Sequence, residues 1–227
     1  LCNTVKAAES MGIVVPFDPD HKDSKGRPAP ITNQVGPFTL GVTNVSPLDM
    51  AAAYATPASG GDYCKPMPVS SIVDLKGEVV KEYKPECERV LSKDEAAQIN
   101  DILRGVQQPG GFGFANGTAL RIPSAAKTGT TQDNKAVWYN GYTPELATAA
   151  MIAGVTSKGI PMSLAGVTIN GRGLNFSAVG GSSLAGPMWK KAMGVVQDYL
   201  EPSNFDIPPK TQPKAPKKDK KDKKNED

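Results

Sequence analysis

The sequence predicts an α+β fold, an antiparallel sheet flanked by helices, because three strand patterns follow one another and helical patterns stand on both sides of them. The strand patterns cover residues 125–131, 136–142 and 146–155. Two short turn sequences separate them, Gln132-Asp133-Asn134 and Thr143-Pro144-Glu145. Connections this short join antiparallel neighbours, so the three strands should lie side by side in one sheet.

The flanking helices are located mainly by their start signals. Ser46 followed by Pro47 is typical of a helix N-cap and first helical position, and Ser92 with Glu95 forms a capping-box pattern. Apolar spacing supports these two helices and two others. The predicted helices cover residues 4–11, 46–58, 92–105 and 182–200.

Two connections are expected to lack regular structure. Residues 17–30 are polar and rich in proline and glycine, which favours a surface loop. His21 lies in this segment and is the only histidine, so we expect it to be solvated rather than catalytic. Residues 109–114 are rich in glycine but do not form a phosphate-binding G-x-x-x-x-G-K-[ST] motif, so they should be a flexible connection.

The charge distribution divides the chain into a body and a tail. With 39% hydrophobic residues the 227-residue chain can bury a core. Residues 207–227 hold eight of the 26 basic and four of the 23 acidic residues, which leaves 18 basic and 19 acidic residues in residues 1–206. A body with a net charge near −1 gives no electrostatic reason to expect nucleic acid as a partner. We expect a folded body over residues 1–206 and a disordered Lys/Pro-rich tail, which is either merely solvated or attracted to anionic polymers or lipid headgroups.

The front of the chain indicates that sequence precedes it. Leu1 is not an initiator methionine, and the opening residues run directly into a helical pattern. No stretch approaches the roughly 20 apolar residues that span a bilayer, and no basic start followed by an apolar run marks an export signal. Any anchor or signal is therefore expected outside this sequence.

The three cysteines have no metal-ligand spacing, so neither a metal site nor another cofactor is predicted. Two of them flank a hairpin pattern that turns at Asp74-Leu75-Lys76-Gly77 and should pair Val73 with Glu78. Continuing that register outward places Cys64 opposite Cys87, within reach of a disulfide. The alternative is two unrelated buried thiols. A disulfide would indicate an oxidising, extracytoplasmic location.

The string Lys127-Thr128-Gly129-Thr130 is the strongest chemical signal in the chain. Lysine supplies a cation that can polarise a nucleophile or attract a carboxylate, and the threonines supply hydroxyls. Gly129 lets another backbone approach the strand closely. A K-T-G-[ST] string arises by chance in about one chain in a hundred of this size, so its position in a predicted strand before a tight turn is what gives it weight.

With Trp138, Gly141 and Tyr142 in the following strand, the region resembles the serine penicillin-recognising enzymes, which carry this motif on the edge strand of their sheet. Apart from the tail, the resemblance covers almost the whole chain and is strongest to the transpeptidase domain of class A (bifunctional) penicillin-binding proteins. The stretches that carry it are residues 46–61, 66–77, 117–131, 138–144 and 181–189. It implies the penicillin-binding transpeptidase (serine β-lactamase-like) fold, here incomplete at its N-terminal side. It also implies an enzyme on the extracytoplasmic face of the bacterial membrane that crosslinks peptidoglycan stem peptides ending in D-Ala-D-Ala and that binds β-lactams.

The same resemblance implies a role for each residue of the motif. Lys127 would contact the serine region and assist proton transfer, and Thr128 and Thr130 would bind the carboxylate of the substrate or β-lactam. The backbone N–H of Thr130 would supply half of an oxyanion hole. Gly129 would allow the close approach of the ligand.

The nucleophile itself is not predicted in this chain. The family's serine lies in an S-x-x-K motif and is completed by S-x-N, and no S-x-N occurs here. Ser124-Ala125-Ala126-Lys127 matches S-x-x-K, but residues three apart in a strand point to opposite faces, so Ser124 is rejected. Lys135-Ala136-Val137-Trp138 also departs from the family's usual acidic start. The chain alone should be inactive and should depend on the upstream part of the same protein, for which the resemblance to class A implies a glycosyltransferase domain.

Two other functions remain open at this point. A β-lactamase or D,D-carboxypeptidase would use the same motif with water as the acyl acceptor. A non-catalytic extracytoplasmic binding module would keep the fold without the chemistry.

Overall fold

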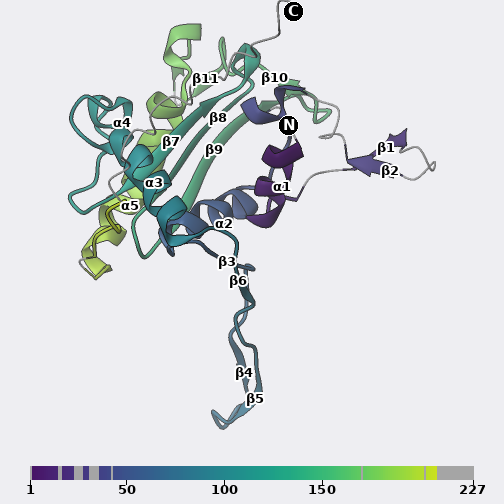
Figure 1. Ribbon diagram of the computed structural model, residues 1–227. Coiled ribbons are helices and arrows are strands. Elements are labelled where there is room, and N and C mark those ends of the chain that lie inside the picture. Colours follow the sequence, from purple (N-terminus) through teal and green to yellow (C-terminus); the bar gives the residue numbers. More distant parts are fainter. Residues whose placement is uncertain are drawn as a thin grey trace, which may run out of the picture.

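The computed structural model describes residues 2–14, 17–22, 28–30, 36–41, 43–169, 171–201 and 203–208 (Figure 1). Its α-helices are α1 (Cys2–Ser10), α2 (Pro47–Ala58), α3 (Lys93–Arg104), α4 (Phe112–Ala115) and α5 (Gly186–Val196). Its strands are β1 (Phe17–Lys22), β2 (Pro28–Pro30), β3 (Asp62–Cys64), β4 (Ser71–Val73), β5 (Val79–Glu82), β6 (Cys87–Arg89), β7 (Ala125–Thr130), β8 (Ala136–Tyr142), β9 (Ala147–Val155), β10 (Pro161–Met162), β11 (Thr168–Ile169) and β12 (Arg172–Gly173). Short helical turns are η2 (Gly36–Leu40), η3 (Gly105–Gln107), η4 (Gln132–Asn134), η5 (Phe176–Ala178), the π-helical η6 (Gly181–Ala185) and η7 (Gln197–Tyr199).

The main sheet has the strand order β10-β9-β8-β7, and every neighbouring pair is antiparallel. Its three long strands are those that the sequence predicted, which confirms the α+β fold with an antiparallel sheet. The two-residue β10 was not predicted because so short a strand has no alternation to detect. β7 is the outer strand on the other side, so one of its edges is open in the described sheet.

Helices cover both faces of the sheet. On one face, α2 contacts β8 and β9 and α3 contacts β7, while on the other face α5 and η6 contact β8 and β9. The main core lies under α5, where Trp189 is only 2% exposed and its ring lies 5.1 Å from that of Tyr139. Gly141 makes room for this indole, because a Cβ there would lie 2.4 Å from the Trp189 ring.

The predicted caps are present. The Ser46 hydroxyl accepts the N–H of Asp49 at 3.0 Å and begins α2. Ser92 forms a full capping box, since its hydroxyl accepts the N–H of Glu95 while the Glu95 carboxylate accepts the N–H of Ser92. The Ser92 hydroxyl also donates to the Glu95 carboxylate at 2.7 Å, and this hydrogen bond, together with the one from the Ser92 N–H, holds the pKa of Glu95 below its usual value. Local hydrogen bonds of this kind explain why both helix starts could be predicted from sequence.

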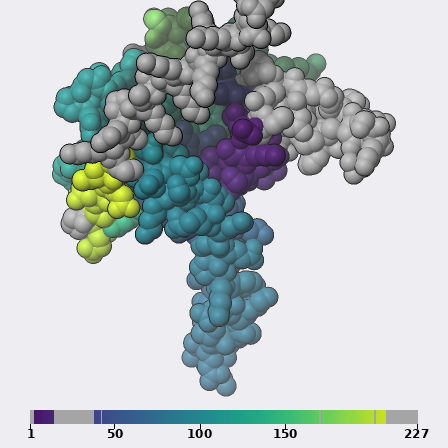
Figure 2. Space-filling view, viewed as in Figure 1, coloured from purple at the N-terminus to yellow at the C-terminus, as the bar shows by residue number. Residues whose placement is uncertain are grey.

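A long hairpin arm, residues 62–89, projects from the body (Figures 1 and 2). Its root is the pair β3 and β6, in which Cys64 lies opposite Cys87 and the two form a disulfide. Its outer part is the pair β4 and β5, which is exposed on all positions. The outer part of the arm therefore adds nothing to the core of the body.

The register of the arm was predicted correctly at its root and wrongly at its tip. Val73 pairs with Val79 and not with Glu78. The reason is the Asp74 carboxylate, which accepts the backbone N–H groups of Lys76 at 2.8 Å and Glu78 at 2.9 Å and so draws Glu78 into the turn. Register shifts farther along the arm return it to the pairing expected at the disulfide.

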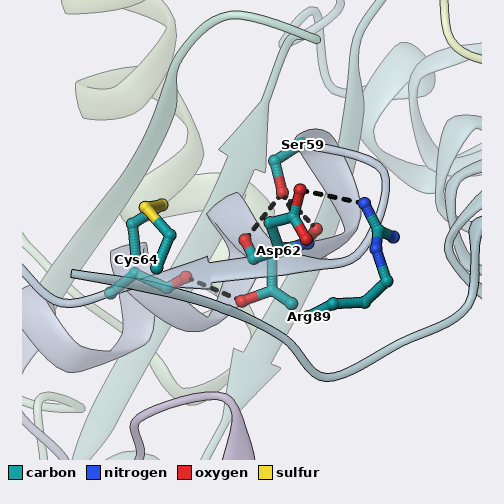
Figure 3. The surroundings of a disulfide bond; sticks show 7 residues. Ser59, Asp62, Cys64 and Arg89 are labelled. Carbon is teal, nitrogen blue, oxygen red and sulfur yellow. Dashed lines mark hydrogen bonds and ion pairs between the residues drawn. A yellow bond between two sulfur atoms is a disulfide. The ribbon is translucent and has the colours of Figure 1, made fainter. Parts of the chain in front are cut away.

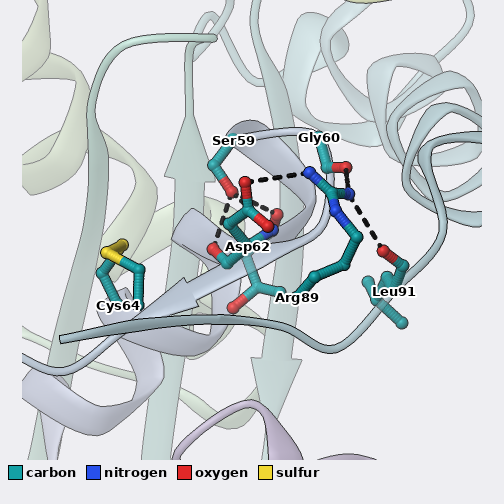
Figure 4. Close-up of polar contacts among 8 residues, drawn as sticks. Ser59, Gly60, Asp62, Cys64, Arg89 and Leu91 are labelled. Carbon is teal, nitrogen blue, oxygen red and sulfur yellow. Dashed lines mark hydrogen bonds and ion pairs between the residues drawn. A yellow bond between two sulfur atoms is a disulfide. The ribbon is translucent and has the colours of Figure 1, made fainter.

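The root of the arm is tied to the C-terminal end of α2 by a polar cluster (Figures 3 and 4). Arg89 donates to the Gly60 carbonyl at 2.8 Å and pairs with the Asp62 carboxylate at 2.9 Å. The Ser59 hydroxyl donates to the Asp62 carbonyl at 2.7 Å and accepts its N–H at 3.0 Å. Gly61 lies so close to the Leu91 carbonyl that a Cβ would be 2.3 Å from that oxygen. The arm is thus fixed at its root and free beyond it.

Replacing both Cys64 and Cys87 with alanine should loosen the arm more than the body. A disulfide that closes a loop of this size removes about 3 kcal/mol of chain entropy, but an isolated two-stranded ribbon is only marginally stable. Without the bond the arm should open in the native state as well as in the unfolded state. Both states then gain most of this chain entropy, so most of it cancels in the free energy of unfolding. Hydrogen exchange should become faster over residues 65–86, and the free energy of unfolding of the body should fall by clearly less than about 3 kcal/mol. Unchanged exchange in the arm would contradict this prediction.

Two further segments differ from their predicted structure, and the predicted tail lies mostly outside the described residues. Residues 17–30 are not a loop throughout, since β1 and β2 pair there; a polar two-stranded ribbon lacks the apolar alternation that marks a strand. Residues 109–114 are not simply a flexible connection, because Phe112–Ala115 forms the helical turn α4. Except for Ile207 and Pro208, the predicted tail lies outside the described residues.

Candidate active site

The motif Lys127-Thr128-Gly129-Thr130 lies in β7, the outer strand of the sheet. Lys127 is opposite Asn140 in β8, Gly129 is opposite Trp138, and both belong to the face covered by α2 and α3. Thr128 and Thr130 belong to the face covered by α5 and η6, because side chains alternate along a strand. The sequence prediction that the motif would lie in a strand is confirmed.

The pairing of β7 decides which backbone groups reach the open edge. The Thr131 N–H donates to the Ala136 carbonyl at 2.9 Å, so residues 129 and 127, two and four positions earlier, also direct their N–H and C=O groups to β8. The N–H and C=O of Thr128 and Thr130 consequently point away from β8. The open edge therefore presents a row of donors and acceptors in the stretch that carries the motif.

Lys127 lies over this edge. Its ammonium donates to the Thr128 carbonyl at 2.8 Å, and its side chain is exposed. The positive charge is therefore placed beside the backbone N–H of Thr130 two residues later. A cation next to a free N–H on a strand edge is an arrangement that attracts an anionic or carbonyl oxygen.

A buried polar cluster lies beneath Lys127 on the same face. Tyr142 donates to the Asn100 side chain at 2.8 Å, and the Oδ1 atom of Asn140 is buried without a partner among the described residues. Burial raises the pKa of Tyr54 above its usual value, although a hydrogen bond with Asn140 partly opposes the rise. Burial, and to a smaller degree the charge of Tyr54, raises the pKa of Tyr142. Both phenols thus stay protonated at neutral pH and are not general bases.

On the opposite face, Thr130 is held by the segment that precedes α5. The backbone N–H of Gly181 donates to the Thr130 hydroxyl oxygen at 3.2 Å. Gly181 is buried, whereas the side chain of Thr130 is exposed toward the edge. Nothing in the local sequence around Thr130 indicated this contact, which joins residues 51 positions apart.

The β7–β8 turn also contains a residue that sequence reasoning missed. Asn134 is buried, has a positive φ of 55°, and donates from Nδ2 to the Phe176 carbonyl at 3.1 Å. Asparagine tolerates this left-handed conformation better than most residues, so its presence in a tight turn was the available signal. Trp138 and Tyr142 share one face of β8. Tyr142 packs between Tyr54 and Phe205, while Trp138 is partly exposed beside Gly129.

Within the part of the chain that the structure describes, β7 holds no serine or cysteine. Ser124 is buried directly before β7 begins, three positions from Lys127, and is not aligned with it on one face. Within the described ranges there is no group of three or more His, Cys, Asp or Glu side chains that could hold a metal ion. In the same residues, no helix has the length and apolar character to cross a membrane.

The profile of the penicillin binding protein transpeptidase domain matches residues 10–193. The chain belongs to the family of penicillin-binding protein transpeptidase domains. The class A type expected from the sequence is confirmed by its relatives, which are penicillin-binding proteins 1A.

Two such relatives and one solved structure illustrate the match. Penicillin-binding protein 1A of Aquifex aeolicus is 34% identical over 178 residues, 76% of this chain and 22% of that protein. Penicillin-binding protein 1A of Mycolicibacterium smegmatis is 32% identical over 214 residues, 91% of this chain and 25% of that protein. The structure of PonA1 from Mycobacterium tuberculosis has a TM-score of 0.65 and 27% identity, and the match covers 90% of this chain and 52% of that one. A second PonA1 structure is a complex with penicillin V. The chain thus spans about a quarter of the length of these curated relatives.

Proposed function

We propose that this chain is the C-terminal part of the catalytic domain of a peptidoglycan D,D-transpeptidase, residues 1–206, followed by the Lys/Pro-rich tail of residues 207–227. Its nucleophilic serine and S-x-N motif would be supplied by preceding sequence of the same protein. The observation that carries the proposal is the open edge of β7, where the Lys127 ammonium binds the Thr128 carbonyl and toward which the Thr130 N–H points, with no serine or cysteine in the same strand.

The reaction would be acyl transfer. The upstream serine attacks the carbonyl carbon of the penultimate D-alanine of a stem peptide ending in D-Ala-D-Ala, and the peptide bond to the last D-alanine breaks. The serine proton passes to a base in the serine region, and a proton is returned to the departing amine of D-alanine. An amine of a neighbouring stem peptide then attacks the acyl-enzyme, which forms the crosslink and frees the serine. A β-lactam would acylate the same serine as its ring opens.

Each residue of the edge would have a separate task. The Thr130 N–H would stabilise the oxyanion together with the N–H of the serine. Lys127 would lower the free-energy barrier for proton transfer from the serine. To do so, its ammonium would have to leave the Thr128 carbonyl. The hydroxyls of Thr128 and Thr130 would bind the terminal carboxylate, and Gly129 would keep the edge free of a side chain. The motif needs no cofactor for this chemistry.

The remaining parts of the proposal concern the whole protein. It would act on the extracytoplasmic face of the bacterial membrane, held by a segment outside this chain and preceded by a glycosyltransferase domain. The disulfide between Cys64 and Cys87 supports this location, because such bonds persist in oxidising compartments.

Labelling with a fluorescent penicillin tests the proposal. A longer protein that includes the preceding sequence should be labelled covalently, whereas residues 1–227 alone should not be. Labelling of the shorter chain would overturn the assignment of the serine to preceding sequence and would make Ser124 the candidate nucleophile. Absence of S-x-x-K and S-x-N from the preceding sequence would overturn the transpeptidase itself and favour a binding module. With stem peptides as substrate, a crosslinked product distinguishes a transpeptidase from a carboxypeptidase, which releases D-alanine only.

A further inference from the structure

Gly181 occupies a position on the sheet where no other residue fits. A Cβ at this position would lie 2.4 Å from the Trp138 carbonyl oxygen, 2.9 Å from the Gly129 carbonyl oxygen and 3.0 Å from the Gly129 nitrogen. All three contacts are backbone atoms of paired strands, which cannot move aside cheaply. The glycine therefore lets the start of η6 lie directly on β7 and β8, and in this place its N–H reaches the Thr130 hydroxyl.

The segment that carries Gly181 is itself tied down. The Phe176 carbonyl accepts the Nδ2 of Asn134, and the Ala178 carbonyl accepts the Ser183 hydroxyl at 2.8 Å. The Asn175 side chain accepts the N–H of Ala178 at 2.8 Å. Residues 175–183 are thus bonded both to the β7–β8 turn and to themselves, so that the Gly181 N–H has a fixed direction.

A hydroxyl has one proton to donate and two lone pairs to accept with. The Gly181 N–H occupies a lone pair of the Thr130 oxygen, and the hydroxyl proton has no acceptor among the described residues. Accepting one hydrogen bond strengthens the next bond that a hydroxyl donates. The exposed Thr130 hydroxyl is therefore prepared to donate its proton to an anionic oxygen at the open edge.

We propose that Gly181 is a positioning residue that fixes the Thr130 hydroxyl as a proton donor to the carboxylate of a bound ligand, and so makes the site selective for ligands that carry this carboxylate. This inference rests on the proposed function, because it assumes that a ligand binds at the β7 edge. Gly181 lies outside the motif, in the segment before α5, and would be a further residue on which the choice of ligand depends. A charged acceptor makes the hydrogen bond both shorter and stronger than a neutral one would.

Hydrogen exchange on residues 1–227 tests the contact itself. The Gly181 amide should be protected in the unaltered chain, and it should exchange about tenfold faster in Thr130→Val, which keeps the shape of the side chain and removes the acceptor. Thr130→Ser should retain the protection. Equal exchange in all three proteins would overturn the proposal, whether or not the chain belongs to a transpeptidase.

Acylation of the longer protein tests the selectivity. Gly181→Ala should lower the ratio of the acylation rate constant for benzylpenicillin to that for its methyl ester by roughly tenfold to a hundredfold, because a hydrogen bond to a charged group is lost. Thr130→Val should lower the ratio similarly, and Thr130→Ser should restore it. Gly194→Ala in α5 is the matched control: its Cβ would meet only the Lys190 side chain, at 3.9 Å, which is an ordinary contact.

The outcomes separate the two proposals. Acylation of the unaltered longer protein, with an unchanged ratio in Gly181→Ala, would overturn the role of Gly181 and leave the transpeptidase intact. Failure of penicillin to acylate the unaltered longer protein would overturn the proposed function and the carboxylate selectivity with it. If Gly181→Ala does not fold, the exchange rate of the Gly181 amide in Thr130→Val decides the question, since this variant adds no heavy atom to the crowded contact and removes only the acceptor of the Gly181 N–H.

Discussion

Replacing Lys127 with methionine should slow acylation of the longer protein by penicillin by roughly a hundredfold to ten-thousandfold, the usual range for losing a proton-transfer group. Methionine keeps the length and apolar stem of lysine but has no charge and no proton to exchange. The Lys127 ammonium is the cation at the open edge of β7, beside the Thr130 N–H, so both the proton transfer and the attraction of a carboxylate should suffer. The second-order rate constant of acylation by a fluorescent penicillin measures the effect.

Two further variants make this result specific. Lys158→Met removes an exposed lysine in the turn between β9 and β10 and should leave the acylation rate unchanged. Lys127→Arg keeps the positive charge but cannot give up its proton at ordinary pH. Loss of activity in the arginine variant as well would assign proton transfer to Lys127, whereas retention would assign it an electrostatic role alone. A wild-type rate in Lys127→Met would remove Lys127 from the reaction.

Replacing Trp189 with alanine should lower the free energy of unfolding by about 3–5 kcal/mol, the usual cost of truncating a large buried aromatic side chain. The indole is the centre of the core between α5 and the sheet, where it packs on Tyr139 and donates from Nε1 to the Gly141 carbonyl at 3.3 Å. Because Gly141 and the backbone around it cannot move in to fill the space, the cavity should persist. Denaturant unfolding with the disulfide intact measures the loss.

Tyr199→Ala provides the control for this measurement. Tyr199 is 84% exposed at the end of the same helical region, and surface truncations usually change the free energy of unfolding by no more than about 0.5 kcal/mol. A loss in Trp189→Ala no larger than that in Tyr199→Ala would show that the α5 side of the sheet is not the main core.

The sheet and the helix starts could be predicted because their signals are local. Turns such as Thr143-Pro144-Glu145 and caps such as Ser46 and Ser92 determine the backbone within a few residues of themselves. The arm shows where this local reasoning stops. The pairing of Cys64 with Cys87 was predicted correctly, but the turn was not, because counting turn residues ignores the two N–H groups that the Asp74 carboxylate binds.

The candidate site could be predicted only in part, for a related reason. The motif in β7 is continuous in sequence, so Lys127, Thr128, Gly129 and Thr130 were found by their chemistry and strand context. Gly181 and Asn140 were not found, because Gly181 reaches Thr130 across 51 positions of sequence and Asn140 lies opposite Lys127 only through the register of β7 and β8. A glycine required by lack of space and an asparagine buried beside the motif look, in sequence, like any others.

The open edge of β7 has a consequence for the chain when it is produced by itself. Unpaired N–H and C=O groups on an outer strand are a template on which a strand of another molecule can pair, and aggregation begins at such edges. Charged side chains that lie across an edge obstruct this pairing, and Lys127 lies across β7 at Thr128. The residue proposed to assist bond formation in the complete enzyme should therefore also help to keep the isolated chain soluble.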